Sequence, residues 1–310
     1  MMLKVSLQNE LLFKPGIDNE TYYRMYRDAG IDGVDYTLFN VNEKDGFPDK
    51  IFRKSTEEII ETVIGPDKEK LERYGLSVCQ THSPFPTYLL GEDDKNEARR
   101  IATEKSIELT AYLGAKYVVV HPFHQIFLTT PAEQRKRNID FYTQFIDVAK
   151  KNHVTICLEN MWVSRNTNIF ESACEDPHEA NDYIDTLNAL AGEEIFGFCF
   201  DTGHATLCGR YMKNTLEALG NRVKVLHIHD ASKTSDLHTI PYALSSGSHA
   251  LTDWTGFVDG LRGIEYRGDI NFEAGNAFLI FPESTHPALC GLFAAIGRHF
   301  ADEVRKEKEN

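Results

Sequence analysis

Carboxylate and imidazole side chains recur in this sequence directly after short apolar runs. The clearest run is residues 195–200, which is mostly apolar or aromatic and is followed at once by Asp201, Thr202, Gly203 and His204. A short apolar run without alternation is typical of a strand buried on both faces, as in a parallel sheet covered by helices. Ligands bind at the carboxyl ends of such strands. Asp201 and His204 are therefore candidate functional groups, although Asp201 or Thr202 could equally cap a following helix.

The same pattern is repeated along the chain. The side chains that follow apolar runs in this way are Asp35, His82, His121, Glu159, Asp201 with His204, His227 and Glu273. Carboxylates and imidazoles gathered around one point would repel unless a cation lies among them. A divalent ion is the simple solution, and one imidazole among oxygen ligands suits Mn, Mg, Co or Zn without choosing between them. The sequence therefore predicts a divalent-metal site where the strand ends meet.

These residues need a fold that brings distant strand ends together. The apolar runs predict eight strands, at 2–8, 33–35, 76–79, 117–120, 154–158, 195–200, 223–230 and 269–273. Helical periodicity between them predicts helices at 19–29, 55–74, 93–113, 180–190, 211–219 and 253–261, one after a capping box at 130–133, and a last helix with Leu289, Leu292, Phe293 and Ile296 on one stripe. Strands that alternate with helices favour a single (β/α)8 barrel. An open doubly wound sheet is the alternative, but it would normally begin with a glycine-rich turn.

The length of 310 residues suits one barrel domain spanning 1–310. Residues 41–50 are expected to form a loop, residues 161–177 a long loop over the carboxyl-terminal face of the barrel, and residues 305–310 a frayed tail. The formal charge of −14 disfavours nucleic acid or an anionic membrane as a partner. There is no signal-peptide or membrane-spanning pattern, and the six cysteines form no C-x-x-C pair. We therefore expect a cytoplasmic protein with reduced cysteines.

Five short motifs carry a family resemblance. They are Leu158-Glu159-Asn160, Asp201-Thr202-Gly203-His204, Leu226-His227-Ile228-His229-Asp230, Asp253-Trp254 and Asn271-Phe272-Glu273. In their order and spacing they resemble the sugar-phosphate isomerase/epimerase family, which belongs to the xylose-isomerase-like group of barrels. The resemblance spans essentially the whole chain, and it is more specific for the superfamily than for the reaction. It implies a small sugar or sugar-derived substrate, and it makes a homodimer plausible.

The resemblance implies one divalent metal ion held by Glu159, Asp201, His227 and Glu273, with Glu159 and Glu273 as the acid/base pair. In such chemistry the metal polarises a carbonyl and a neighbouring hydroxyl, which stabilises an enediolate. One carboxylate removes the proton beside the carbonyl and the other returns it. The alternative for both glutamates is a salt-bridged place in the core, but no basic residue stands next to either in the sequence.

Other residues are candidates for substrate contact or a second metal ion. They are His82, His121, His204, His229, Asp236, His238, Trp162 and Lys233, with Arg165 as a further candidate for a phosphate or hydroxyl contact. His82 and His121 could instead be capping groups, and His229 a residue at the rim. Trp162, Phe123 and Trp254 could line the pocket, although such aromatics are more often part of a core.

The same residues also resemble the endonuclease-IV-like branch of this barrel group, which hydrolyses DNA at abasic sites with several zinc ions. Its ligand pattern maps in order onto His82, His121, Glu159, Asp201, His204, His227, Asp236, His238 and Glu273. Clustered metals would activate water and stabilise a phosphoryl transition state. The acidic charge and the lack of loops that interleave basic and aromatic residues count against DNA. A multi-metal phosphoesterase is therefore the alternative to sugar chemistry. The stretch 242–249 departs from the sugar-acting pattern, which puts substrate contacts from that loop in doubt.

Overall fold

The computed structural model describes residues 3–9, 18–38 and 50–306. Eight parallel strands form one sheet in the order β12-β1-β2-β3-β4-β5-β8-β9. The eight strands are β1 Val5–Gln8, β2 Gly33–Thr37, β3 Ser77–His82, β4 Tyr117–Val119, β5 Thr155–Glu159, β8 Phe196–Asp201, β9 Val223–His227 and β12 Ile270–Phe272. A parallel bridge from Ile228 to Phe272 joins the two ends of the sheet. The predicted (β/α)8 barrel is therefore confirmed.

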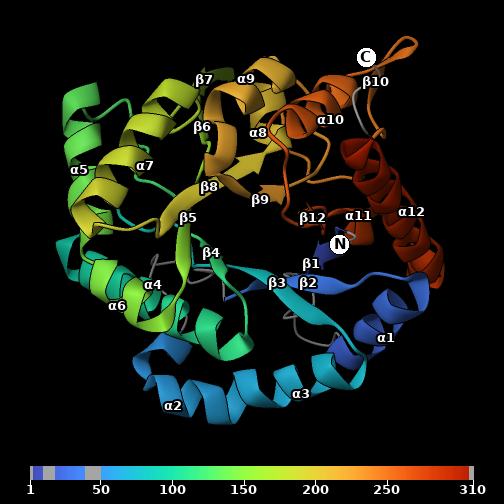
Figure 1. Ribbon diagram of the computed structural model, residues 1–310, viewed down its shortest axis with the longest axis horizontal. Coiled ribbons are helices and arrows are strands. Elements are labelled where there is room, and N and C mark those ends of the chain that lie inside the picture. Colours follow the sequence, from blue (N-terminus) through green and yellow to red (C-terminus); the bar gives the residue numbers. More distant parts are fainter. Residues whose placement is uncertain (1–2, 10–17, 39–49, 307–310) are drawn as a thin grey trace.

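Helices surround the strands, and the first and last of them lie side by side (Figure 1). The helices are α1 Asn19–Ala29, α2 Thr56–Ile59, α3 Gly65–Arg73, α4 Asp93–Leu113, α5 Pro131–Thr143, α6 Ile146–Asn152, α7 Pro177–Ala191, α8 Thr202–Leu207, α9 Met212–Leu219, α10 Trp254–Gly263, α11 Ala277–Ile280 and α12 His286–Arg305. Short 3-10 turns occupy Lys50–Arg53, Gly220–Arg222 and Glu283–Thr285. The hydroxyl of Tyr22 on α1 lies 2.9 Å from Nδ1 of His286 on α12, which closes the ring of helices.

Local sequence signals explain most helix boundaries. Thr130 and Glu133 form the expected capping box at the start of α5. Gly30 and Gly114 end α1 and α4 in the left-handed conformation that glycine adopts readily. The helix predicted at 55–74 is one helical stretch, but a π-helical turn at Ile60–Ile64 separates α2 from α3. On α12, Leu289 and Phe293 are buried as expected, whereas Leu292 is exposed.

The connections contain elements that were not expected from the sequence. Residues 161–177 are not a plain loop, because β6 (Trp162–Arg165) and β7 (Asn168–Glu171) form an antiparallel hairpin. A second hairpin, β10 (Ser245–Ser246) with β11 (His249–Ala250), lies in the altered segment after His238. The helix α8 directly after β8 was not predicted as an element. The loop predicted at 41–50 and the end of the tail, 307–310, lie largely outside the described residues. Helix α12 ends at Arg305, the first residue of the predicted tail.

Two further expectations can be compared with the structure. All six cysteines lie in the described ranges and all are free. Among the described residues, no helix is both long enough and apolar enough to cross a bilayer. The strand-end predictions hold for His82, Glu159, Asp201 and His227, which are the last residues of their strands. Asp35 differs, because β2 continues to Thr37 and places Asp35 inside the strand.

Candidate metal centre

The turn from β8 into α8 shows how Asp201 is held. Its Oδ1 accepts a hydrogen bond from the backbone N–H of His204 at 2.6 Å, which caps α8. Its Oδ2 lies 3.0 Å from Nε2 of His229. The side chain is fully buried at the end of the strand. The two interpretations of Asp201, as a helix cap and as a functional group at the barrel rim, are therefore compatible in one residue.

Thr202 and Gly203 fix the position of His229. The hydroxyl of Thr202 donates to the carbonyl of His229 at 2.8 Å and accepts from its N–H at 3.0 Å. A Cβ atom on Gly203 would lie 1.9 Å from Cε1 of the His229 ring, so only glycine fits at this position. Each residue of the Asp-Thr-Gly-His motif therefore has a structural reason, and His229 is a buried part of the site rather than a surface residue.

Four buried residues bring ligand atoms together at the carboxyl end of the barrel. Glu159, Asp201, His227 and Glu273 offer one atom each, and these atoms lie within 4.8 Å of one another. Nδ1 of His227 is 3.3 Å from Oε2 of Glu159 and 3.1 Å from Oε2 of Glu273. This is the set that the sequence resemblance implied, and the structure brings all four members together.

Two polar side chains inside the barrel orient this group. Oδ2 of Asp35 lies 3.2 Å from Nε2 of His227, on the side of the ring opposite the glutamates. A proton on Nε2 facing Asp35 leaves Nδ1 free to act as a ligand. Gln8 donates from Nε2 to Oε1 of Glu273 at 2.7 Å, so Oε2 of Glu273 faces His227. Both orienting residues come from strands β1 and β2.

A second group of ligand atoms shares Glu159. Nε2 of His82 and Nε2 of His121 face each other at 3.0 Å, and Nε2 of His121 lies 3.0 Å from Oε2 of Glu159. Nδ1 of His82 is 2.7 Å from the carbonyl of Ser83, which favours the tautomer with its free lone pair on Nε2. Burial, with the neighbouring rings of His121 and His227, lowers the pKa of His82 and favours its neutral form. These three atoms lie within 3.8 Å of one another, and His82 and Glu159 also form a possible ligand group with His227.

A third group surrounds Asp236. Its Oδ2 lies 3.1 Å from Nε2 of His204 and 3.1 Å from Nε2 of His238, and it accepts a hydrogen bond from Nε1 of Trp162 at 3.3 Å. Nδ1 of His204 is 2.7 Å from the carbonyl of Asn160, which turns Nε2 toward Asp236. His229 stacks on His238 with ring centroids 4.2 Å apart and connects this group to Asp201.

The two glutamates differ in their protonation behaviour. Burial raises the pKa of Glu273, and this effect outweighs the charges of His227 and His238. Burial would also raise the pKa of Glu159, but His227 and His121 hold it well below its usual value. Two carboxylates whose pKa values are pushed apart can serve as a base and an acid.

Three histidines of the site favour their protonated form in the metal-free chain. Burial opposes the protonated form of His204, yet Asp201 and Asp236 raise the pKa of its ring well above the usual value. Burial likewise opposes protonation of His238, but Glu273 and Asp236 raise its pKa to about 10. The pKa of His227 is also raised well above its usual value, against the effect of burial, by Cys199, Glu273 and Glu159. These protons occupy the nitrogens that would bind a cation.

The donor set fits a divalent metal ion. Several buried polar atoms of the site have no partner in hydrogen-bond geometry: Oε2 of Glu159, Nδ1 of His227 and Oδ1 of Asp236. A buried group without a partner costs free energy, so such atoms call for an ion or a ligand. Imidazole nitrogens with carboxylate oxygens suit Zn, Mn or Co, and they do not determine which metal is bound.

Four of the remaining candidates lie outside these groups. Lys233 is exposed on the loop after β9. Arg165 is also exposed, and its guanidinium lies 5.0 Å from the ring centroid of Phe127. Trp254 is buried against Phe257 and Phe300, and Phe123 is buried beside Tyr88. The last two are core aromatics, which is the alternative that the sequence left open.

Sequence reasoning missed the residues that hold the candidate ligands. Gln8 was not singled out, Asn160 was named only as part of a motif, and Asp35 was noticed only as a strand-end residue. Asn160 accepts from the N–H of Asp201 at 2.8 Å and donates to its carbonyl at 3.0 Å, which locks the ends of β5 and β8 together. A signal was present, because a buried strand rarely contains a glutamine or asparagine without a partner for it.

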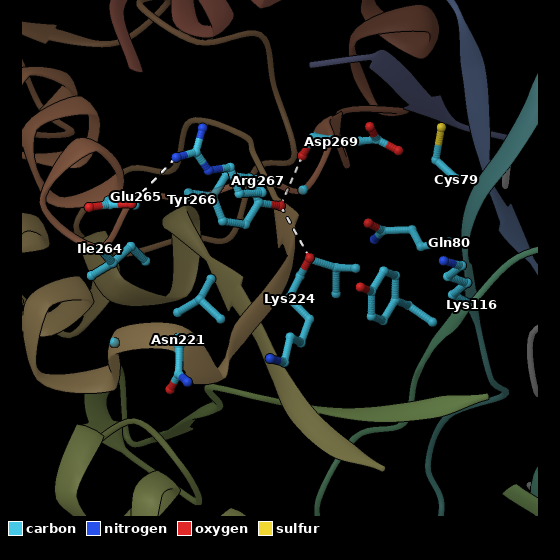
Figure 2. A pocket seen from close by; sticks show the side chains of 15 residues that line it. Cys79, Gln80, Lys116, Asn221, Lys224, Ile264, Glu265, Tyr266, Arg267 and Asp269 are labelled. Atoms are coloured by element: carbon cyan, nitrogen blue, oxygen red, sulfur yellow. Dashed lines mark hydrogen bonds and ion pairs between the residues drawn. The ribbon is translucent and has the colours of Figure 1, made fainter. Parts of the chain in front are cut away.

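A cavity of about 450 Å³ lies at the opposite end of the barrel (Figure 2). It is lined by Cys79, Lys116, Lys224, Arg267 and Asp269 among others, which stand near the amino-terminal ends of strands β3, β4, β9 and β12. Tyr266 donates to the carbonyls of Lys224 and Asp269 there. Active sites of such barrels lie at the carboxyl-terminal face, so this cavity is not the candidate site.

Comparison with known proteins agrees with this fold. The sequence model of the xylose isomerase-like TIM barrel family matches residues 24–284. The chain belongs to the xylose isomerase-like TIM barrel family. Among solved structures, D-allulose 3-epimerase from Methylomonas sp. superposes on this TIM barrel with a TM-score of 0.66 at 17% identity, covering 96% of this chain and 98% of the other. The IOLI protein with a zinc atom superposes with a TM-score of 0.63 at 17% identity, covering 97% and 98%.

A relative found by sequence comparison belongs to the endonuclease-IV-like branch of these barrels. The probable endonuclease 4 of Staphylococcus aureus is 26% identical over 220 residues, which are 67% of this chain and 69% of that protein. Structures at this level of identity establish the fold, and the activity must be argued from the site.

Proposed function

We propose that this protein is a metal-dependent isomerase or epimerase of a ketose, a sugar phosphate or a related hydroxy-carbonyl compound. The observation that carries the proposal is the four-residue group Glu159, Asp201, His227 and Glu273, whose ligand atoms lie within 4.8 Å of one another. A divalent ion held there would polarise a substrate carbonyl. Solved structures of sugar epimerases superpose on nearly the whole chain, and this similarity supports the same class of reaction.

The two glutamates supply the proton transfers in this proposal. Glu159 has the depressed pKa and takes the proton from the carbon beside the carbonyl. Glu273 has the raised pKa and returns a proton. Gln8 and Asp35 orient Glu273 and the ring of His227. His204, fixed by the carbonyl of Asn160, is placed to contact a substrate oxygen.

Solvent exchange tests this proposal without knowledge of the product. The protein, loaded in turn with Mn, Co, Mg or Zn, is incubated in deuterated water with a panel of ketoses and sugar phosphates. We expect one or more substrates to exchange the hydrogen beside the carbonyl, as seen by NMR. A panel without exchange, together with cleavage of an abasic-site duplex or a phosphodiester by the same preparation, would reverse the assignment.

One observation favours a second candidate, a multi-metal phosphoester hydrolase. All nine residues of the endonuclease-IV-like pattern converge in three groups that are linked by Glu159, His229 and Asp236. Metal content distinguishes the candidates. One ion per chain in protein purified without chelator supports the isomerase or epimerase, whereas two or three zinc ions support the hydrolase. In the latter case Asp236→Asn should remove one ion and leave the rest.

A further inference from the structure

An apolar groove adjoins the candidate metal centre. Its volume is about 430 Å³, within the range of small-molecule sites. Its lining residues come from the loops after β3 and β4 and from strand β6: Phe85, Pro86, Thr87, Tyr88, Leu89, Pro122, His124, Gln125, Ile126, Phe127, Leu128 and Val163. None of these twelve side chains carries a carboxylate, an ammonium or a guanidinium group. A phosphate or another charged group would therefore find no oppositely charged partner among these lining side chains.

One lining residue of the groove, Phe85, contacts the site. The ring of Phe85 lies 4.5 Å, centroid to centroid, from the ring of His121, whose Nε2 is 3.0 Å from Glu159. Phe85 also stacks on His124 at 5.6 Å. A molecule with one end among the metal-site residues would therefore meet Phe85 before it reached the rest of the groove.

Two polar groups of the lining already have partners, and the His124 ring is uncharged at neutral pH. The hydroxyl of Thr87 donates to the carbonyl of His121 at 2.8 Å, and Oε1 of Gln125 accepts from the N–H of Leu90 at 2.9 Å. Burial, helped by His121 and His204, lowers the pKa of His124 to about 4, so this ring is uncharged at neutral pH. A bare sugar chain would bring hydroxyls that find few partners in the groove.

Contacts with the β6–β7 hairpin fix the side of the groove formed by Phe127 and Leu128. The Phe127 ring packs edge-on against Phe170 of the β6–β7 hairpin with centroids 5.3 Å apart, and the Arg165 guanidinium lies 5.0 Å from its centroid. Phe127 and Leu128 are nevertheless 38% and 67% exposed. Large apolar side chains left exposed in a preformed groove are typical of a binding surface.

We infer that this groove binds an apolar, ring-sized group carried by the substrate, so that the substrate is a sugar-like unit joined to an aromatic or similar apolar portion rather than a free ketose. The inference rests on the proposed function only in placing the substrate's reactive end at the metal centre. The hairpin β6–β7 and the residues 122–128 then determine which attached group is accepted.

Two metal-binding probes test this inference. Acetohydroxamic acid and phenylacetohydroxamic acid share one chelating group and differ by a phenyl ring. We expect the metal-loaded protein to bind the phenyl-bearing probe about 10-fold or more tightly in calorimetry, as burial of one ring implies. Phe127→Ala and Leu128→Ser should reduce this advantage to about 3-fold or less and leave acetohydroxamate affinity unchanged. Leu190→Ser is the matched control, since Leu190 is an exposed leucine on α7 outside the groove.

The outcomes separate the groove from the metal centre. Equal affinity for the two probes, or a phenyl advantage that survives both groove substitutions, overturns the groove assignment and leaves the metal centre intact. If neither hydroxamate binds the metal-loaded chain, the metal centre of the proposed function is wrong and the groove assignment falls with it.

Discussion

Oδ2 of Asp35 lies 3.2 Å from Nε2 of His227, on the far side of the imidazole from Glu159 and Glu273. Both side chains are fully buried. Asp35 also accepts hydrogen bonds from Gln80 and Asn271, each at 3.0 Å, so its carboxylate is itself fixed. An orienting group behind a ligand imidazole sets its tautomer and raises its basicity.

Asp35→Asn should therefore weaken metal binding. We expect the dissociation constant to rise by about 10- to 100-fold, the usual cost of losing such an orienting carboxylate. Competition with a chromophoric chelator measures it. Asp32→Asn is the matched control, because Asp32 pairs with Arg298 and the N–H of Val5, away from the site. Equal affinities of Asp35→Asn and the natural chain would show that Asp35 does not act through His227.

Glu159→Gln and Glu273→Gln should each abolish proton exchange into substrate. Loss of a positioned acid or base costs about 10²- to 10⁴-fold in rate, and a glutamine keeps the shape of the side chain but cannot transfer the proton. Exchange in deuterated water gives the rate, and circular dichroism with thermal melting checks that the barrel remains folded. Exchange at the natural rate in either variant would remove that glutamate from the acid/base pair.

Metal binding should release protons. The pKa values of His204, His227 and His238 are raised by neighbouring acidic groups, so their protonated forms are favoured in the metal-free chain. A ligand nitrogen must lose that proton, and metal affinity therefore falls as the pH decreases. Calorimetry at one pH in two buffers of different ionisation enthalpy should yield a net release of about one to three protons per chain. Identical enthalpies in both buffers would contradict these raised pKa values.

Gly203→Ala should disturb the site through His229. The new Cβ would meet the His229 ring at 1.9 Å, which forces that ring away from Asp201. We expect about 1–3 kcal/mol of lost stability from the overpacking, together with weaker metal binding. Gly291→Ala is the control, because a Cβ there meets nothing within 4 Å. It lies inside α12, where alanine should stabilise by about 0.5–1 kcal/mol. Chemical unfolding measures both variants.

Glu175 should make stability fall with increasing pH. Burial raises its pKa from 4.5 to about 8, although Asn160 donates to Oε2 at 3.1 Å and Nε of Arg210 lies 3.5 Å from Oε1. The unfolded chain loses this proton above about pH 4.5 while the folded chain retains it, so the stability present below pH 4.5 is lost progressively up to pH 8.

Glu175→Gln should remove the decrease in folding stability between pH 4.5 and pH 8, because glutamine does not titrate. We expect the variant to match the natural chain near pH 4.5 and to be more stable at pH 8, by on the order of 3 kcal/mol. Denaturant unfolding at both values measures it. Glu97→Gln is the control: hydrogen bonding to Arg100 lowers the pKa of that exposed carboxyl from 4.5, so its effect on stability should change little between pH 4.5 and pH 8. A constant difference between Glu175→Gln and the natural chain from pH 4.5 to pH 8 would refute a protonated Glu175.

The sequence predicts the parts of the molecule that follow from local rules. Glu159, Asp201 and His227 could be found because each ends a buried apolar strand, and the barrel brings strand ends to one rim. The contacts behind them could not be found, since they join distant segments. Gln8 and Glu273 are 265 residues apart, and only the closure of β1 against β12 brings them together.

The β6–β7 hairpin was missed for a different reason. Its residues 162–171 lack the alternation of apolar and polar side chains that marks a half-buried strand. The turn between the two strands did carry a sequence signal, Asn166. Asn166 and Thr167 adopt φ of 51° and 65°, a conformation that asparagine favours. The groove beside the hairpin depends on packing between two loops and a strand, which no local pattern encodes.

Asp201 places an unusual constraint on this chain's evolution. One of its oxygens caps α8 and the other faces His229. A substitution of Asp201 that removes the ligand oxygen would therefore also remove the cap of α8. Selection for folding alone would still favour a capping residue such as aspartate at this position. Descendants that lose the reaction can be expected to keep Asp201 longer than Glu273, and an intact Asp-Thr-Gly-His motif is accordingly a poorer marker of activity than the glutamate pair.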